Sequence, residues 1–418
     1  MGNPGLEAVV AITEHELLAG AGERIERFRK ADATIRVVTA DGRAVGGAQV
    51  HIEEVRQAFL VGCQANPLLR YTDPQQEATY EREFAALMNY ATLASFGWSW
   101  YEQAPGQTQA AHLEAQARWC KKHGIVTKGH PLIFHEGYPD WAPADAEEAR
   151  QVLRARVADT VSRFAGLVDI WDVINEATVS ARHDNGVGHW VKRDGVEKTV
   201  SAALTWAHAA NPKATLLYND WNVGPNYEAL AQYLIDSKQP VDAFGIQSHM
   251  HKGEWPIERA WEVCETYSTF GKPLHFTELT VLSGEHAWSP PRPDPWPTTL
   301  EGEARQADYV EKLYTVLFSH PAVAAITWWD FADGAWLGAP AGLVRENLSP
   351  KPAYDRLIKL LKGQWWTRAD LMTSGDGTAA FRGFLGRYRI TVSTPARAKV
   401  KTMELRPGKR NTLTVKLD

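Results

Sequence analysis

One stretch near the middle of the chain decides the fold: Asp169-Ile170-Trp171-Asp172-Val173-Ile174-Asn175-Glu176. Its centre contains four apolar residues, Ile170, Trp171, Val173 and Ile174, so it predicts a short buried β-strand. Seven other runs of the same type occur between residues 59 and 362. They cover residues 59–64, 91–96, 125–135, 214–220, 243–249, 274–280 and 324–331. This part of the chain therefore repeats one kind of unit eight times.

Longer amphipathic stretches separate these runs and predict helices. They cover residues 77–89, 110–122, 144–164, 196–210, 228–237 and 302–318. Eight strands that alternate with helices over roughly 300 residues predict an α/β fold, a (β/α)8 TIM barrel. An open, doubly wound sheet is the alternative, but eight repeats of one unit favour the closed barrel.

The segments on either side of the predicted barrel have β character. Residues 24–58 contain two alternating stretches around the turn Asp41-Gly42, and residues 363–418 contain four short strands. The four strands are expected at residues 381–385, 388–394, 399–405 and 412–417. Neither segment alone has enough strands for a stable core. Because the two ends of a closed barrel are neighbours, we expect the two segments to form one small sandwich at the side or base of the barrel.

The composition narrows the classes of partner. The chain has 17 Trp residues, which suit stacking on sugar rings, although large barrels also bury many aromatics. The net charge is -5 and no basic stripe occurs, so we expect no nucleic-acid partner. No apolar run approaches the ~18 residues of a membrane span, so we expect no membrane partner.

Cysteine usage and the start of the chain give further expectations. Cys63, Cys120 and Cys264 are odd in number and far apart, which fits neither a disulfide framework nor a metal site. We therefore expect no cofactor and no metal. The first residues, Met1-Gly2-Asn3-Pro4, lack a basic segment followed by an apolar one, so no signal peptide is visible. A monomer is expected.

Polar residues gather where the predicted strands end, and the ends of barrel strands build the active site in this fold. The fourth strand ends in Asn175-Glu176 and the seventh in Thr277-Glu278. Two such carboxylates facing each other fit glycoside hydrolysis, in which one protonates the leaving oxygen and the other attacks or stabilises the anomeric carbon. Unrelated surface carboxylates are the alternative. The histidines near them lack the spacing of a zinc site.

Several of these segments resemble family 10 glycoside hydrolases, the endo-β-1,4-xylanases. The segment 171–176 resembles their acid/base motif W-D-V-x-N-E, and Thr277-Glu278-Leu279 is similar to their nucleophile motif T-E-L-D. The resemblance continues in the family's order at residues 129–135, 219–222, 245–249, 326–333 with Trp336, and 349–354. The resemblance covers residues 59–362, and the motifs taken together are highly specific for this family.

The resemblance implies a retaining β-glycosidase with Glu176 as general acid/base and Glu278 as nucleophile. It also implies that Asn175 binds the 2-hydroxyl of the sugar being cleaved and that His249 donates a hydrogen bond to Glu278. The further substrate-binding residues that we expect are His130, Gln247, Trp329, Trp336, Trp98 and Asn219. Core packing is the alternative role for each of them. The family also implies a secreted or periplasmic protein that acts on a carbohydrate.

The second strand departs from the family. The motif T-P-E-N-x-M-K-W, whose Glu, Asn and Lys bind the glycone sugars, is replaced at residues 92–99 by residues without those polar groups. Phe96, Trp98, Trp100 and Tyr101 offer apolar faces that stack on sugars or close the subsite. This favours an altered glycone preference, with removal of a terminal or short unit, over ordinary endo-xylanase action on linear xylan. A carbohydrate-binding protein without catalysis is the alternative function.

Overall fold

The computed structural model describes residues 12–287 and 289–417, so the start of the chain, where no signal peptide was visible, lies outside the described residues. Eight parallel strands form a closed ring, because β13 returns to pair with β3 and β10 pairs with β12. They are β3 (Leu60–Gln64), β4 (Tyr90–Leu93), β7 (Val126–Gly129), β8 (Ile170–Asn175), β9 (Thr215–Asp220), β10 (Ala243–Ile246), β12 (Leu274–Val281) and β13 (Val323–Trp328). The predicted TIM barrel is confirmed.

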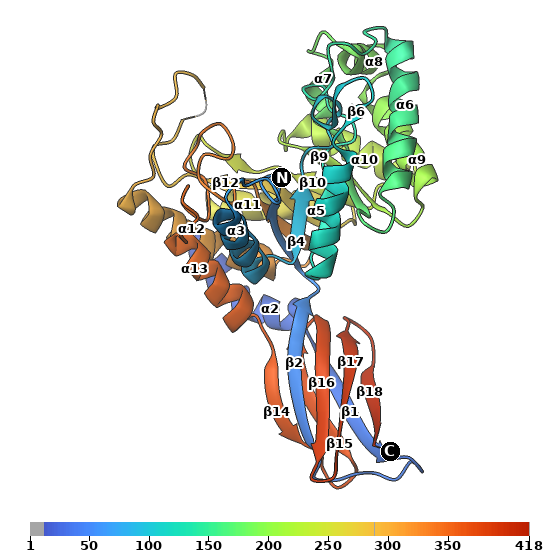
Figure 1. Cartoon of the computed structure of the whole chain (residues 1–418), viewed down its shortest axis with the longest axis vertical. Helices are drawn as coiled ribbons and strands as arrows, with labels where there is room; N and C mark the ends of the chain where they lie inside the picture. The colour runs from blue at the N-terminus through green and yellow to red at the C-terminus, as the bar shows by residue number, and fades with distance from the viewer. Residues whose placement is uncertain (1–11, 288, 418) are drawn as a thin grey trace, which may run out of the picture.

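Helices cover the outside of this ring (Figure 1). The longer ones are α3 (Pro74–Leu87), α5 (Ala110–Lys122), α6 (Ala146–Arg163), α9 (Val196–Ala210), α10 (Pro225–Asp236), α11 (Ile257–Ser268) and α12 (Leu300–Ser319). Helix α6 shows why they form. Asp145 accepts hydrogen bonds from two backbone amides of its first turn, and Ala149, Leu153 and Val157, each four residues apart, are buried against the barrel.

Seven of the other described strands form two sheets that pack face to face, below the barrel in Figure 1. One sheet has the order β15-β1-β18 and the other β14-β2-β16-β17. Their bounds are β1 (Lys30–Thr39), β2 (Gln49–Gln57), β14 (Arg368–Met372), β15 (Thr378–Phe384), β16 (Gly386–Thr394), β17 (Arg397–Leu405) and β18 (Asn411–Leu417). Alternate residues such as Ile35, Val50 and Ile390 point inward and form a core separate from that of the barrel.

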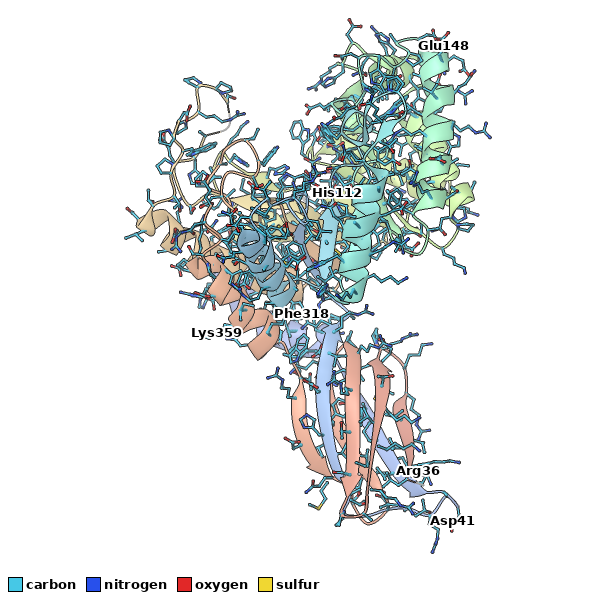
Figure 2. The ribbon with its side chains drawn as sticks, viewed as in Figure 1. Arg36, Asp41, His112, Glu148, Phe318 and Lys359 are labelled. Atoms are coloured by element: carbon cyan, nitrogen blue, oxygen red, sulfur yellow. The ribbon has the colours of Figure 1, made fainter. Side chains whose placement is uncertain are left out.

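The two-sheet unit lies at the N-terminal ends of the barrel strands, because β2 leads directly into β3. Arg29 holds the junction: its guanidinium donates to the carbonyl oxygens of Phe318, His320 and Val323. Trp365 stacks on Phe318 with ring centroids 4.2 Å apart, and Figure 2 labels Phe318 where the barrel meets the sheets. The opposite end of the barrel is therefore left open for a site.

Residues 24–29 were predicted to be β but are helical, as part of α2 (Ala21–Arg29), which follows α1 (Glu14–Ala19). Leu17, Ala21 and Ile25 recur every fourth residue and are all buried, which is the period of a helix and not of a strand. The prediction extended the alternating pattern of β1 too far toward the N-terminus.

Candidate active site

Two carboxylates stand at the open end of the barrel. Glu176 directly follows β8, and Glu278 lies in β12. Both line one cleft of about 1270 Å³, which also reaches the loops after β3 and β4 on one side and after β9 and β10 on the other. Side chains from every part of the barrel mouth can therefore act on one bound molecule.

Glu176 is held in a left-handed backbone conformation, with φ at 54°. Its backbone N–H donates to the Asn219 carbonyl at 2.9 Å, and its Oε1 accepts from Gln247 Nε2 at 2.9 Å and from Asn175 Nδ2 at 3.1 Å. Burial raises the pKa of Glu176 to about 8, and the negative charge of Glu278 adds to this effect, although the Gln247 bond opposes it. At neutral pH this carboxyl group therefore carries a proton that it can donate.

Glu278 has the opposite setting. Its Oε2 accepts from His249 Nε2 at 2.9 Å and its Oε1 from Asn219 Nδ2 at 2.7 Å, while His130 Nε2 lies 3.8 Å from Oε1. Burial alone would raise the pKa of Glu278, but His130 and His249 outweigh burial and lower the pKa below its ordinary value. Glu278 is therefore an ionised carboxylate at neutral pH.

Three amide side chains connect the two carboxylates. Asn219 Nδ2 donates both to Glu278 and, at 2.8 Å, to Asn175 Oδ1. Gln247 Nε2 lies 3.3 Å from the same Asn175 oxygen. Asn219 was expected to bind substrate, but it is fully buried and does not line the cleft. Its two donor bonds instead fix Asn175 and Glu278, because the side chain lies below the surface that a sugar would touch.

A buried cation lies beneath the site. Lys128 Nζ is 2.6 Å from Asp172 Oδ2, and the same oxygen is 2.8 Å from His130 Nδ1. Burial would raise the pKa of Asp172, but Lys128 and His130 lower it, so the carboxylate stays charged and orients the His130 ring. Sequence reasoning found His130 and missed Lys128. Lys128 could have been found from the sequence, because it is a charged residue inside a segment predicted to be a buried strand.

Two tryptophans predicted to bind substrate line the cleft next to the histidines. The Trp336 ring stacks on His249 at 4.3 Å, and Trp329 meets the edge of His130 at 5.3 Å. Trp329 is largely buried and Trp336 is half-buried. The site thus combines two carboxylates with aromatic faces, which is the chemistry that sugar binding requires.

Comparison with known proteins gives the family. The model of Glycosyl hydrolase family 10 matches residues 53–360, more than half of the chain. The chain belongs to glycosyl hydrolase family 10. Among solved structures, xylanase 10B from Thermotoga petrophila in complex with xylobiose is similar, with a TM-score of 0.61 and 26% identity over 73% of this chain and 95% of that chain.

Two curated relatives show how far the likeness extends. Anti-sigma-I factor RsgI6 of Acetivibrio thermocellus is 28% identical over 415 residues, which is 96% of this chain and 50% of that protein. Endo-1,4-beta-xylanase 1 of Arabidopsis thaliana is 25% identical over 391 residues, which is 90% of this chain and 38% of that protein. The family 10 chain therefore spans about half or less of the length of these relatives.

One residue expected to bind sugar in this family 10 barrel lies elsewhere. Trp98 is buried outside the cleft lining, where its Nε1 donates to Glu102 at 2.8 Å and its ring packs edge-on against Tyr138. It lies in α4 (Trp98–Tyr101), a single turn that points Trp98 and Tyr101 inward and Trp100 outward. Trp100 is 42% exposed and lines the cleft. Trp100 is therefore the aromatic side chain that this segment presents to a ligand.

The described residues contain neither a metal-binding cluster nor a membrane-spanning helix. Within residues 12–287 and 289–417, no group of three or more His, Cys, Asp or Glu side chains is placed to hold a metal ion. His135 instead contacts Ser180 at 2.8 Å, and burial lowers its pKa to about 3. No helix in the same part of the chain is long and apolar enough to cross a membrane.

Proposed function

We propose that this family 10 chain is a retaining glycoside hydrolase of xylan-like β-glycans, with Glu176 as general acid/base and Glu278 as nucleophile. One observation carries the proposal. Two carboxyl groups share one cleft, and their surroundings move their pKa values in opposite directions. Pairs of this kind assign an acid and a nucleophile, because one group keeps a proton and the other a negative charge at the same pH.

In the first step, a Glu278 oxygen attacks the anomeric carbon and the bond to the leaving oxygen breaks, while Glu176 gives its proton to that oxygen. The product is a glycosyl ester on Glu278. His249 and Asn219 each donate to Glu278, which keeps the carboxylate ionised and correctly oriented before attack. Asn175 and Gln247 hold Glu176 Oε1, leaving Oε2 for the leaving group.

In the second step, water attacks the anomeric carbon, Glu176 takes its proton, and the ester bond to Glu278 breaks. The change in the role of Glu176 follows from electrostatics. Glu278 loses its charge when it forms the ester, which removes a repulsion that raises the pKa of Glu176. Glu176 therefore ionises more readily in the intermediate and becomes a base. Two inversions at one carbon give net retention.

The shape of the cleft supports a polymeric substrate. Tryptophans line both of its sides, Trp100 after β4 and Trp221 and Trp255 after β9 and β10. Phe96 and Tyr101, which were expected to stack on sugar or fill the glycone side, are buried in the barrel core instead. This arrangement leaves room for sugars on both sides of the carboxylates. It supports cleavage within a chain, in place of the removal of a terminal or short unit that the second strand led us to expect. Xylan lies outside cells, so an extracellular or periplasmic location fits the proposal.

The test is to incubate the protein with linear xylo-oligosaccharides and follow the first product by proton NMR. The proposal expects a β-anomer that later mutarotates, and no product from a Glu176→Gln, Glu278→Gln double variant. An initial α-anomer would contradict the retaining mechanism. Cleavage by the double variant would place the catalytic groups elsewhere.

A relative that matches 96% of this chain is named as an anti-sigma-I factor and not as a hydrolase, which favours a second candidate, a protein that binds a carbohydrate in this cleft without hydrolysing it. The same samples separate the two. Binding of xylo-oligosaccharides by calorimetry with no product after long incubation would support the second candidate. Turnover by the unmodified protein, lost in the double variant, would exclude it.

A further inference from the structure

The loop after β3 places an arginine in the cleft, on the side where the family's glycone-binding Glu, Asn and Lys are absent. Arg70 lines the cleft there, together with the uncharged polar residues Asn66, Ser95, Gln103 and Gln109. A guanidinium group is planar, always charged and suited to bidentate binding of a carboxylate. The sequence analysis did not single out Arg70.

Side chains from two neighbouring helices hold this loop in place. Gln116 on α5 is fully buried, and its Nε2 lies within 3.3 Å of the carbonyl oxygens of Ala65, Asn66 and Leu68. Glu77 on α3 accepts from the backbone N–H groups of Leu69 at 2.7 Å and Tyr71 at 2.9 Å, one on each side of Arg70. Leu69 has a positive φ of 61°, a conformation that persists only where surrounding contacts impose it.

Among the described residues, the Arg70 guanidinium has no acidic partner. Within residues 12–287 and 289–417, no carboxylate oxygen lies within 4.0 Å of it, and no protein group accepts a hydrogen bond from it. Two arginines show the contrast: Arg345 contacts Glu303 at 2.6 Å, and Arg156 donates to the Leu132 carbonyl. His112, on the end of α5 away from the sheets (Figure 2), is close enough for Arg70 to lower its pKa further below the value set by burial. Arg70 thus carries a positive charge that no described residue pairs, on a loop whose backbone is held in place.

The other charges of the cleft limit where a negative ligand group can bind. Glu278 is ionised, and Glu136 adds negative potential near Glu176. An acidic sugar is therefore disfavoured at the point of cleavage. The position of Arg70 beyond the end of β3 suits a carboxylate on a neighbouring glycone unit or its branch.

We propose that Arg70 forms a subsite for the carboxylate of a uronic acid, carried on the glycone side of a xylan-like chain beyond the sugar that is cleaved. The inference rests on the proposed function, and it defines the substrate class as an acid-substituted β-glycan. It also accounts for the loss of the neutral-sugar contacts at residues 94–98, since a charged contact supplies selectivity in their place.

The experiment compares two oligosaccharides that differ only in charge: a xylo-oligosaccharide with one glucuronic acid branch on a glycone unit, and the methyl ester of that branch. We expect the unmodified protein to show a KM about two- to fivefold lower for the acid, the range of a partly exposed ion pair. Arg70→Gln should remove this difference and leave the ester unchanged. Arg70→Lys should keep part of it, and added salt should reduce it.

Lys252→Gln is the matched control, because Lys252 is an exposed cation on the opposite side of the same cleft. It should keep the preference for the glycone-side acid. Equal KM values for acid and ester in the unmodified protein, or an equal loss on both in Arg70→Gln, would overturn the inference. Calorimetric binding of both oligosaccharides gives the same comparison without turnover, so failure of the Arg70 subsite is distinguished from failure of the hydrolase proposal.

Discussion

His249 Nε2 lies 2.9 Å from Oε2 of Glu278, and the same imidazole ring stacks on Trp336. Because this contact favours the ionised carboxylate, it helps to set the pH range in which Glu278 can attack. Burial alone would push the pKa of Glu278 the other way.

Replacement of His249 should therefore move the acidic side of the pH profile. Without the histidine, the pKa of Glu278 rises. On lowering the pH, Glu278 then becomes protonated earlier, so activity begins to fall at a higher pH than in the unmodified protein. His249→Asn should shift the acidic limb of kcat/KM upward and lower kcat about tenfold to a hundredfold, the effect of a lost charged hydrogen bond. An acidic limb that does not move would show that His249 does not tune the nucleophile.

Glu176 should control the alkaline side of the profile. Its pKa of about 8 means that the proton needed by the leaving group is lost as the pH rises through 8, so kcat/KM should fall there. Glu176→Gln should remove this limb and slow substrates with poor leaving groups roughly 10²–10⁴-fold more than activated aryl glycosides. Equal losses on both kinds of substrate would remove Glu176 from the acid role.

Trp100 should bind a sugar on the glycone side. Stacking of this type contributes about 0.5–1.5 kcal/mol, so Trp100→Ala should raise KM for xylo-oligosaccharides a few-fold to about tenfold, with little change for a short aryl glycoside that does not reach it. Trp141 is the control, because it has nearly the same exposure, 41%, and lies outside the cleft lining. If Trp141→Ala has the same effect, the change reflects the fold and not a subsite.

Glu54 should make stability depend on pH. This residue of β2 is buried, accepts from Thr367 N–H at 2.9 Å, and has a pKa raised to about 8 by burial. Because the pKa of Glu54 is higher in the folded protein than the value near 4.5 in the unfolded chain, ionisation favours unfolding. The contribution of Glu54 to the free energy of unfolding is therefore fully present below pH 4.5 and is lost as the pH rises through 8. Glu54→Gln should remove a loss on the order of a few kcal/mol between pH 5 and 9 in chemical denaturation. A variant with the same pH dependence as the unmodified protein would contradict the assignment.

The alternation of strands and helices was sufficient to predict the barrel, because eight units with one buried face each have few ways to pack. The same signal identified the ends of β8 and β12, where Glu176 and Glu278 lie. The pattern did not predict short elements whose structure depends on tertiary contacts. The single turn of α4 turns Trp98 inward and Trp100 outward, and β14, with only five residues, was missed. Arg70 was missed because its importance comes from the contacts that hold its loop, and one of these comes from Gln116, which is distant in sequence.

The central claim is that Glu278 forms the covalent intermediate, and trapping that intermediate tests it most directly. An activated 2-deoxy-2-fluoro-β-glycoside suits this purpose, because the fluorine destabilises the oxocarbenium-like transition state while the good leaving group still allows the ester to form. After incubation, peptide mass mapping should find one fluoroglycosyl group on the peptide that contains Glu278, and none in Glu278→Gln. A label on Glu176, or hydrolysis of the parent glycoside with no label on any residue, would contradict the account.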